Sequence, residues 1–238
     1  TAAMAGGWNG KAGVGAGIVY NYVKNDIAAD VKNSVLTADT LNGEAVSDAT
    51  IVSVGAGVAI GGKAFNGAGS GSWNDLKNDT KVTFAGNTIT GKNISEQVQN
   101  ESSIINIAGE VAGGKGMAMG LSLAYNSLNN TTGTYLTDND ITLTGTDNAI
   151  KLSTTNQGKA LAVAGGVNVN IDKEILGAVG TVAINRGVSN TESVIDGKTT
   201  GENTKLDNVK ELSVTAAELT KKTTVAGSVS VGGKKVGV

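Results

Sequence analysis

Apolar and polar residues alternate along much of this chain. In the segments 51–60, 104–111, 161–169 and 225–231, branched or aliphatic residues take many of the alternate positions, and Gly, Ala, Ser or Asn take most positions between them. A period of two residues is that of a strand with two unlike faces, whereas an amphipathic helix repeats about every 3.6 residues. We therefore predict strands for these segments. The segment 93–103 fits a short helix or a loop.

The alternation is itself repeated along the chain. An aromatic or aliphatic residue followed by Asn recurs at spacings of 53, 52 and 59 residues, with the Asn at Asn21, Asn74, Asn126 and Asn185. A fixed period of this size is typical of stacked units that bury their apolar faces on one another. The sequence therefore predicts one repeat array of copies of about 55 residues. The approximate copies are 1–50, 51–104, 105–160, 161–224 and a partial copy at 225–238.

The repeat predicts an all-β solenoid. We divide each copy into four strand-like pieces, with turns at Gly-Gly-Lys (61–63, 113–115 and 232–234) and at Asn-Gly or Asp-Gly pairs. If each copy makes two turns of a coil, eight or nine turns stacked about 4.8 Å apart give a rod of about 40 Å. Stacked antiparallel β-hairpins are the alternative fold, because alternation does not report strand direction.

Recurring residues at the turns have a structural and a binding interpretation. The four repeated Asn residues suit a turn or a ladder of amides bonded from copy to copy, and a ligand-binding role is the alternative. Lys63, Lys115 and Lys234 line up along one edge if the turns stack. Such a row protects an exposed edge and keeps it soluble, or it contacts a receptor or polysaccharide.

Composition supports a turn-rich β protein and excludes several kinds of chemistry. Of 238 residues, 35 are Gly, aromatic residues make up 3%, and Pro, Cys and His are absent. The absence of Pro suits strands whose every N–H donates to a neighbour. Without His or Cys there is no Ser-His or Cys-His nucleophile, and we expect neither a cofactor nor a metal centre. The chain holds 19 basic and 21 acidic residues without a basic stripe, so we expect no nucleic-acid partner. No apolar run reaches 18 residues, so we expect no transmembrane segment.

A few residues remain as candidates for chemistry. Asp138 and Asp140 lie in a Thr- and Asn-rich segment that we interpret as a solvated loop, with calcium binding as the weaker alternative. Catalysis on a glycan would require Asp138, Asp140 or Glu174 to line a groove. Trp73 occupies the position that other copies give to Tyr or Ile, which favours packing in the core or at its rim over an exposed sugar-stacking platform.

The chain resembles the repetitive passenger regions of large bacterial autotransporter and two-partner-secretion adhesins, of the filamentous-haemagglutinin and leukotoxin type. The segments 180–185, 212–216 and 225–233, together with Val188 and Asn190, carry the resemblance. It implies a right-handed parallel β-helix that folds outside the cell and stays at the bacterial surface.

The function implied is a structural or adhesive one. The resemblance describes a non-enzymatic stalk that mediates attachment or aggregation and continues into neighbouring repeats of a longer polypeptide. Its partners would be a host or bacterial surface receptor or a glycan. The alternatives are a glycan-active β-helix enzyme and the rod region of a secreted toxin.

Overall fold

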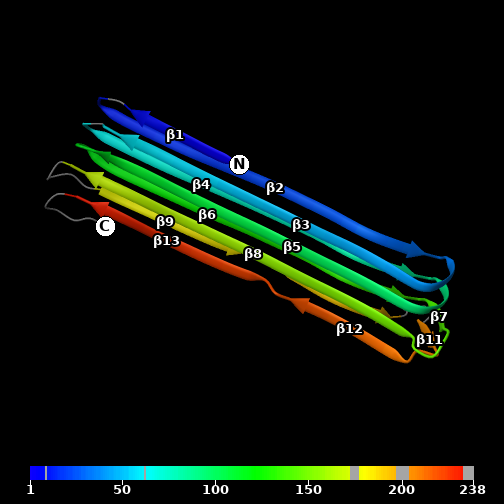
Figure 1. The fold of residues 1–238 in the computed structure, drawn as a ribbon. Coiled ribbons are helices and arrows are strands. Elements are labelled where there is room, and N and C mark those ends of the chain that lie inside the picture. Colours follow the sequence, from blue (N-terminus) through cyan, green and yellow to red (C-terminus); the bar gives the residue numbers. More distant parts are fainter. Residues whose placement is uncertain (9, 62, 172–176, 197–203, 233–238) are drawn as a thin grey trace.

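A computed structural model describes residues 1–238 except 9, 62, 172–176, 197–203 and 233–238, and all the regular elements in the described part are strands. They form two sheets of long strands (Figure 1). The first sheet contains β1 (Ala2–Trp8), β3 (Val35–Ile60), β5 (Thr88–Gly114), β7 (Asp140–Leu143), β8 (Ala149–Asn170), β11 (Lys205–Asp207), β12 (Glu211–Glu218) and β13 (Lys221–Val231). The second contains β2 (Ala12–Lys32), β4 (Phe65–Ala85), β6 (Met117–Thr137), β9 (Gly177–Arg186) and β10 (Ser189–Asp196).

The chain passes back and forth between the two sheets, and the central strands β3, β4, β5, β6 and β8 pair with strands of the preceding and following passage. All pairings among the described strands are parallel. The alternative of stacked antiparallel hairpins is therefore wrong. The register follows the sequence repeat, because Tyr20 pairs with Trp73, Trp73 with Tyr125, and Tyr125 with Ile184.

The strands are much longer than the sequence pieces that we expected. β3 is 26 residues long and β5 is 27, so the expected turn at Asn42-Gly43 lies inside a strand, and 93–103 is strand rather than a helix or a loop. Gly43 is an inward position, and a Cβ there would lie 2.6 Å from the Cγ1 of Val82. This Gly thus makes room in the core instead of breaking the strand.

The number of turns expected from the sequence is also wrong. One copy makes a single passage through each sheet instead of two turns. Strands of 21 to 27 residues are about 70 to 90 Å long, whereas five stacked strands such as β1, β3, β5, β8 and β13 are only about 20 Å deep. The long axis of the molecule therefore runs along the strands, as Figure 1 shows.

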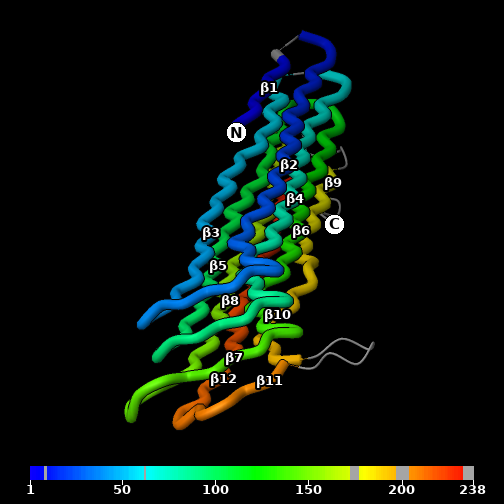
Figure 2. Tube along the Cα trace, turned by 90° about the vertical axis from the view of Figure 1, so that its right-hand side faces the viewer, coloured from blue at the N-terminus to red at the C-terminus, as the bar shows by residue number. Residues whose placement is uncertain are grey.

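The two ends of the strands have different interiors. Near β7 and β11, where Figure 2 shows the layers further apart, large apolar side chains fill the space between the sheets. These include Val82, Phe84, Ile94, Leu136 and Leu152, all at most 1% exposed. We call this end the wide half. Its outer faces are polar, as expected when water lies on one side of a sheet and a core on the other.

At the opposite end, the narrow half, the interior residues are small. It comprises 52–60, 105–113, 161–169 and 223–231 of the first sheet and 12–20, 65–73, 117–125 and 177–184 of the second. Ala59, Ala68, Ala112 and Ala118 form its core, and a Cβ on Gly57 would lie 2.0 Å from the carbonyl oxygen of Gly69. The two backbones approach so closely that only Gly or Ala fits at many inward positions.

Candidate functional site

The repeated Asn residues lie in strands of the second sheet and not at turns, with Asn21, Asn74 and Asn126 in the middle of their strands and Asn185 near the end of β9. Asn21 Nδ2 donates to Asn74 Oδ1 (2.8 Å), Asn74 to Asn126 (3.1 Å) and Asn126 to Asn185 (2.8 Å). Parallel in-register stacking brings identical residues to the same level, so each amide meets the next along the stack. The ladder occupies amide groups that a ligand would otherwise use.

A second set of amides connects the two sheets. Asn78 donates to both Asn130 (3.4 Å) and Asn100 of the first sheet (3.2 Å), and Asn100 donates to Asn156 (2.7 Å). Asn106 of the first sheet donates to Asn126 (2.9 Å). Buried amides need such partners because an unpaired polar group in a core costs about 1 to 3 kcal/mol. These residues therefore fix the register between the sheets.

The calcium candidates lie at the turn between β6 and β7, in the wide half. Asp138 has a positive φ of 56°, and Asp140 begins β7 with its Oδ1 3.9 Å from Lys205 Nζ. Between them, Asn139 is buried and donates to the carbonyl oxygens of Phe84 (2.8 Å) and Thr137 (2.9 Å). Across the described ranges, no group of three or more His, Cys, Asp or Glu side chains could hold a metal ion. Glu174, the third acidic candidate for glycan catalysis, lies outside the described residues.

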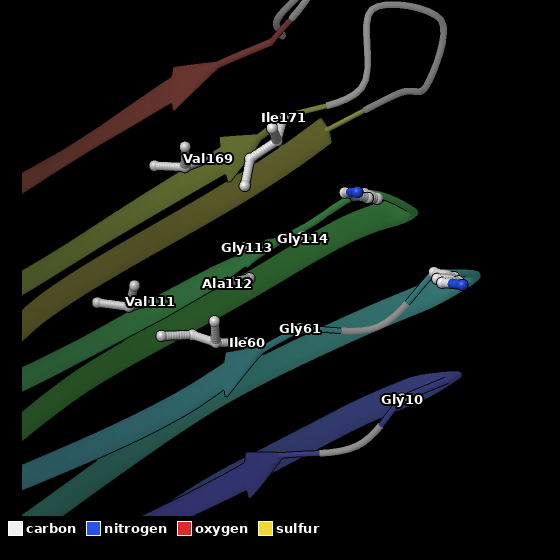
Figure 3. Close-up of a pocket in the computed structure, with 11 residues that line it drawn as sticks. Gly10, Ile60, Gly61, Val111, Ala112, Gly113, Gly114, Val169 and Ile171 are labelled. Carbon is white, nitrogen blue, oxygen red and sulfur yellow. The ribbon is translucent and has the colours of Figure 1, made fainter.

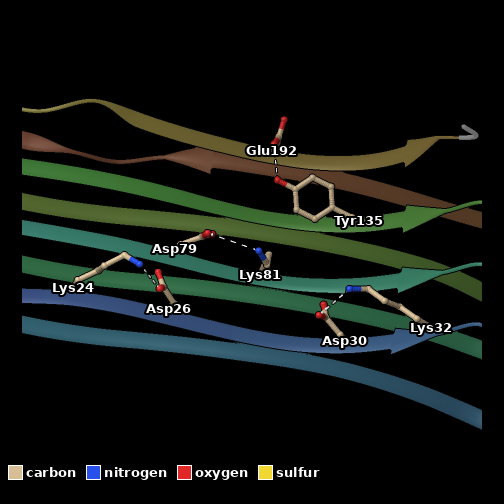
Figure 4. A network of polar contacts seen from close by, with 8 residues as sticks. All are labelled: Lys24, Asp26, Asp30, Lys32, Asp79, Lys81, Tyr135 and Glu192. Carbon is tan, nitrogen blue, oxygen red and sulfur yellow. Dashed lines mark hydrogen bonds and ion pairs between the residues drawn. The ribbon is translucent and has the colours of Figure 1, made fainter. Parts of the chain in front are cut away.

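The outer face of the wide half carries paired charges (Figure 4). Lys24 contacts Asp26 (2.5 Å), and Lys32 contacts Asp30 (2.9 Å). The register places Lys24 beside Lys77 and Asp26 beside Asp79, so equal charges are stacked along the sheet. The ion pairs between a Lys and an Asp two residues apart on one strand offset this repulsion. In one of them, the hydrogen bond from Lys32 lowers the pKa of Asp30. The face is locally neutral and is not a basic stripe.

On both sheets the outer face of the narrow half is apolar. Trp73 is 46% exposed there, with its ring centroid 4.2 Å from that of Tyr125. The expectation that Trp73 packs in the core or at its rim is therefore wrong as to the core: the strand alternation turns Asn74 inward and the neighbouring Trp73 outward, where it packs on Tyr125. The exposed apolar residues on the first sheet include Val52, Val54, Ile107, Val111, Val167, Val169, Val225 and Val229. On the second sheet they include Val14, Ile18, Tyr20, Met117, Met119, Leu121, Val182 and Ile184.

The apolar face continues to the end of the narrow half, where Gly61, Lys63 and the segment 113–115 lie. Figure 3 shows Ile60, Val111, Val169 and Ile171 around a groove of about 520 Å³. Lys63 and Lys115 border the same groove from successive corners, while Lys234 lies outside the described residues. The corners join the first sheet to the second without antiparallel pairing.

Two buried carboxyl groups were not recognised from the sequence. Glu96 is fully buried in the wide half between Ile94 and Val98, and burial raises its pKa to about 8. Glu110 lies inside the narrow half, and burial raises its pKa to about 7. In the part of the chain that the structure covers, neither carboxyl group has a hydrogen-bond partner. Both residues occupy positions of β5 whose side chains point inward in the alternating pattern. This pattern is the signal that could have identified them.

No known protein family, curated protein or solved structure matches this chain in sequence or fold. Within the described ranges we also find no helix suited to crossing a membrane. The arguments about function therefore depend on the geometry of the two sheets and on their surfaces.

Proposed function

We propose that this chain is a structural and adhesive segment of a secreted bacterial surface protein, built as a β-solenoid of the right-handed parallel β-helix type. The observation that carries the proposal is the in-register stacking of the repeats, with Asn21, Asn74, Asn126 and Asn185 bonded in one row. A lattice of this kind extends by adding repeats, since each unit contacts mainly its neighbours. The segment would then be part of a stalk that continues into neighbouring repeats.

The surfaces support attachment or aggregation better than chemistry. The acidic candidates Asp138 and Asp140 flank one turn, where Asp140 lies near Lys205. The paired charges of the wide half offer no basic stripe to a nucleic acid. We therefore propose a non-enzymatic role without a cofactor, at the extracellular bacterial surface, with a surface receptor, a glycan or another copy of the protein as the partner.

Surface display tests this function. The segment would be displayed on a non-adherent bacterium, and settling of the cells and attachment to host cells would be measured. A matched control would display the variant Asn74→Leu/Asn126→Leu, which removes two central rungs of the ladder and should prevent stacking. We expect the wild-type segment alone to cause aggregation or attachment. Equal behaviour of both strains, with equal amounts on the surface, would contradict the proposal.

The fold underlying this function has its own test. Circular dichroism and small-angle scattering of the isolated segment should report strand structure and an elongated particle. A mostly helical or a spherical particle would rule out the stacked arrangement.

A further inference from the structure

The outer face of the first sheet in the narrow half has two apolar ridges with a groove between them. The rows run across the strands, because each residue pairs with its equivalents in the neighbouring strands. One ridge consists of Val54, Ile107, Val163 and Val225, and the other of Val58, Val111, Val167 and Val229. The groove floor consists of Ala56, Gly109, Gly165 and Gly227. The groove measures about 530 Å³ and both ridges border it.

The floor of the groove is open to the outside. A Cβ on Gly109 or Gly165 would have a single neighbouring atom, at 4.0 Å and 3.9 Å, and a Cβ on Gly227 would have none within 4 Å. By contrast, a Cβ on the inward-facing Gly57 would collide with the other sheet. The fold therefore requires small residues on the inside of the narrow half, but it does not require Gly109, Gly165 or Gly227 to be Gly. A complementary partner would require it.

We propose that this ridge-and-groove face binds the same face of a second copy of the chain, with a valine ridge of each copy lying in the glycine groove of the other. The inference rests on the proposed function and names the partner responsible for aggregation. A twofold arrangement allows this, because each copy offers one ridge and accepts one ridge. Ridges on either side of a groove lie about 13 Å apart along the strands, which leaves room for one branched side chain per row.

Three properties of the face favour a second copy. Strand pairing spaces the side chains within each row at about 4.8 Å, so a ridge of another copy has the same spacing and fits along the groove side chain by side chain. The outward positions of the two ridges and the groove include no charged residue. The outer face of the narrow half is nine residues long and four strands wide. Contact between two such faces would bury about 500 Å² per copy and about 1,000 Å² in total, the lower limit for a specific interface. Each added repeat would enlarge the area.

A lipid surface is the other partner that an apolar face could contact, and the shape of this face argues against it. The floor of Ala56, Gly109, Gly165 and Gly227 leaves a groove between the two ridges, and a fluid lipid surface does not require such a groove. A second copy of the chain fills the groove with a ridge of its own. The second copy is therefore the favoured partner.

Sedimentation velocity over a range of protein concentrations tests the proposal. We expect wild type to self-associate. The double variant Val111→Lys/Val167→Lys should have a dissociation constant at least about tenfold higher, because burying an unpaired charge is costly. The control Val46→Lys replaces a valine on the outer face of the wide half that is at least as accessible, and it should behave as wild type. Circular dichroism would verify that each variant keeps its strands. A monomeric wild type, or equal association of all three proteins, would overturn the inference.

Filling the groove separates a second copy from a lipid surface. Gly109→Leu/Gly165→Leu makes the face more apolar but blocks the ridge, so it should weaken self-association while leaving any binding to phosphatidylcholine vesicles unchanged or stronger. Unchanged self-association would refute the ridge-in-groove contact. Vesicle binding by a monomeric wild type would assign the face to lipid instead.

Disulfide cross-linking gives a second measurement of the contact between copies. The chain has no Cys of its own, so a single introduced Cys can react only with the Cys of another copy. A mixture of Gly165→Cys and Val167→Cys chains should form disulfide-linked dimers under oxygen with a copper catalyst, and Val46→Cys should not. Absence of the mixed dimer would count against the contact.

If displayed wild type still attaches to host cells but does not self-associate, only this inference fails. Loss of the elongated strand structure would instead remove the proposed function.

Discussion

The substitution Glu96→Gln provides a sharp test of the interior of the wide half. Glu96 is fully buried between Ile94 and Val98, with Gly43 and Leu152 beside it on the paired strands. Burial raises its pKa from 4.5 to about 8, because the charged carboxylate loses its water without gaining a partner. The folded chain therefore binds this proton more tightly than the unfolded chain does. The contribution of Glu96 to stability is greatest below the unfolded pKa and is lost as the pH rises toward the folded pKa.

The size of the effect follows from the two pKa values. Between pH 5 and pH 9, a group with pKa 4.5 unfolded and about 8 folded lowers the free energy of unfolding by about 4 kcal/mol. Glutamine has the shape of the protonated acid but does not ionise. We expect Glu96→Gln to be close to wild type at pH 5 and more stable than wild type by up to about 4 kcal/mol at pH 9. Glu110 leaves a smaller dependence of the same sign in both proteins.

Denaturant-induced unfolding followed by circular dichroism at several pH values measures this difference. The matched control is Glu101→Gln, which changes an exposed carboxyl group on the outer face of the same strand. Its pH dependence should equal that of wild type. The reasoning fails if the stability difference between Glu96→Gln and wild type stays constant from pH 5 to pH 9, since Glu96 would then remain in one charge state.

Further predictions concern the ladder, the narrow half and calcium. Asn126→Ala should lower the free energy of unfolding by about 3 kcal/mol or more and Asn21→Ala by about 1. Asn126 accepts hydrogen bonds from the buried amides of Asn74 and Asn106 and donates to Asn185, so its loss removes bonds on both sides of the row. Denaturant unfolding measures both. Gly57→Ala should destabilise by about 3 kcal/mol, because its Cβ meets a carbonyl oxygen at 2.0 Å, whereas Gly227→Ala should change little; similar effects would contradict the close approach of the sheets. Calcium should raise the melting temperature of wild type and not of Asp140→Asn if this turn binds the ion, and an unchanged wild type would remove the calcium alternative.

The sequence was sufficient to predict strands and stacking, and it indicated a ladder of amides as one of two structural roles for the repeated Asn residues. The alternation in segments such as 161–169 requires strands, and the spacing of Asn21, Asn74 and Asn126 matches the register in which they pair. These features are local or periodic, so a single sequence reports them. The same alternation also assigns Glu96 and Glu110 to the inward face, although their burial depends on what lies opposite.

The tertiary structure decided strand length, strand direction and which face of each half meets water. Asn42-Gly43 has the composition of a turn, but the side chains of Val82 and Phe84 fill the space beside Gly43 and the strand continues. Trp73 is a large apolar residue of the kind that fills cores, but the close approach of the two sheets leaves room inside the narrow half mainly for small side chains. The apolar residues of that half are therefore turned outward. Alternation along a strand defines two faces, and only the distance to the opposite sheet determines which one becomes the core.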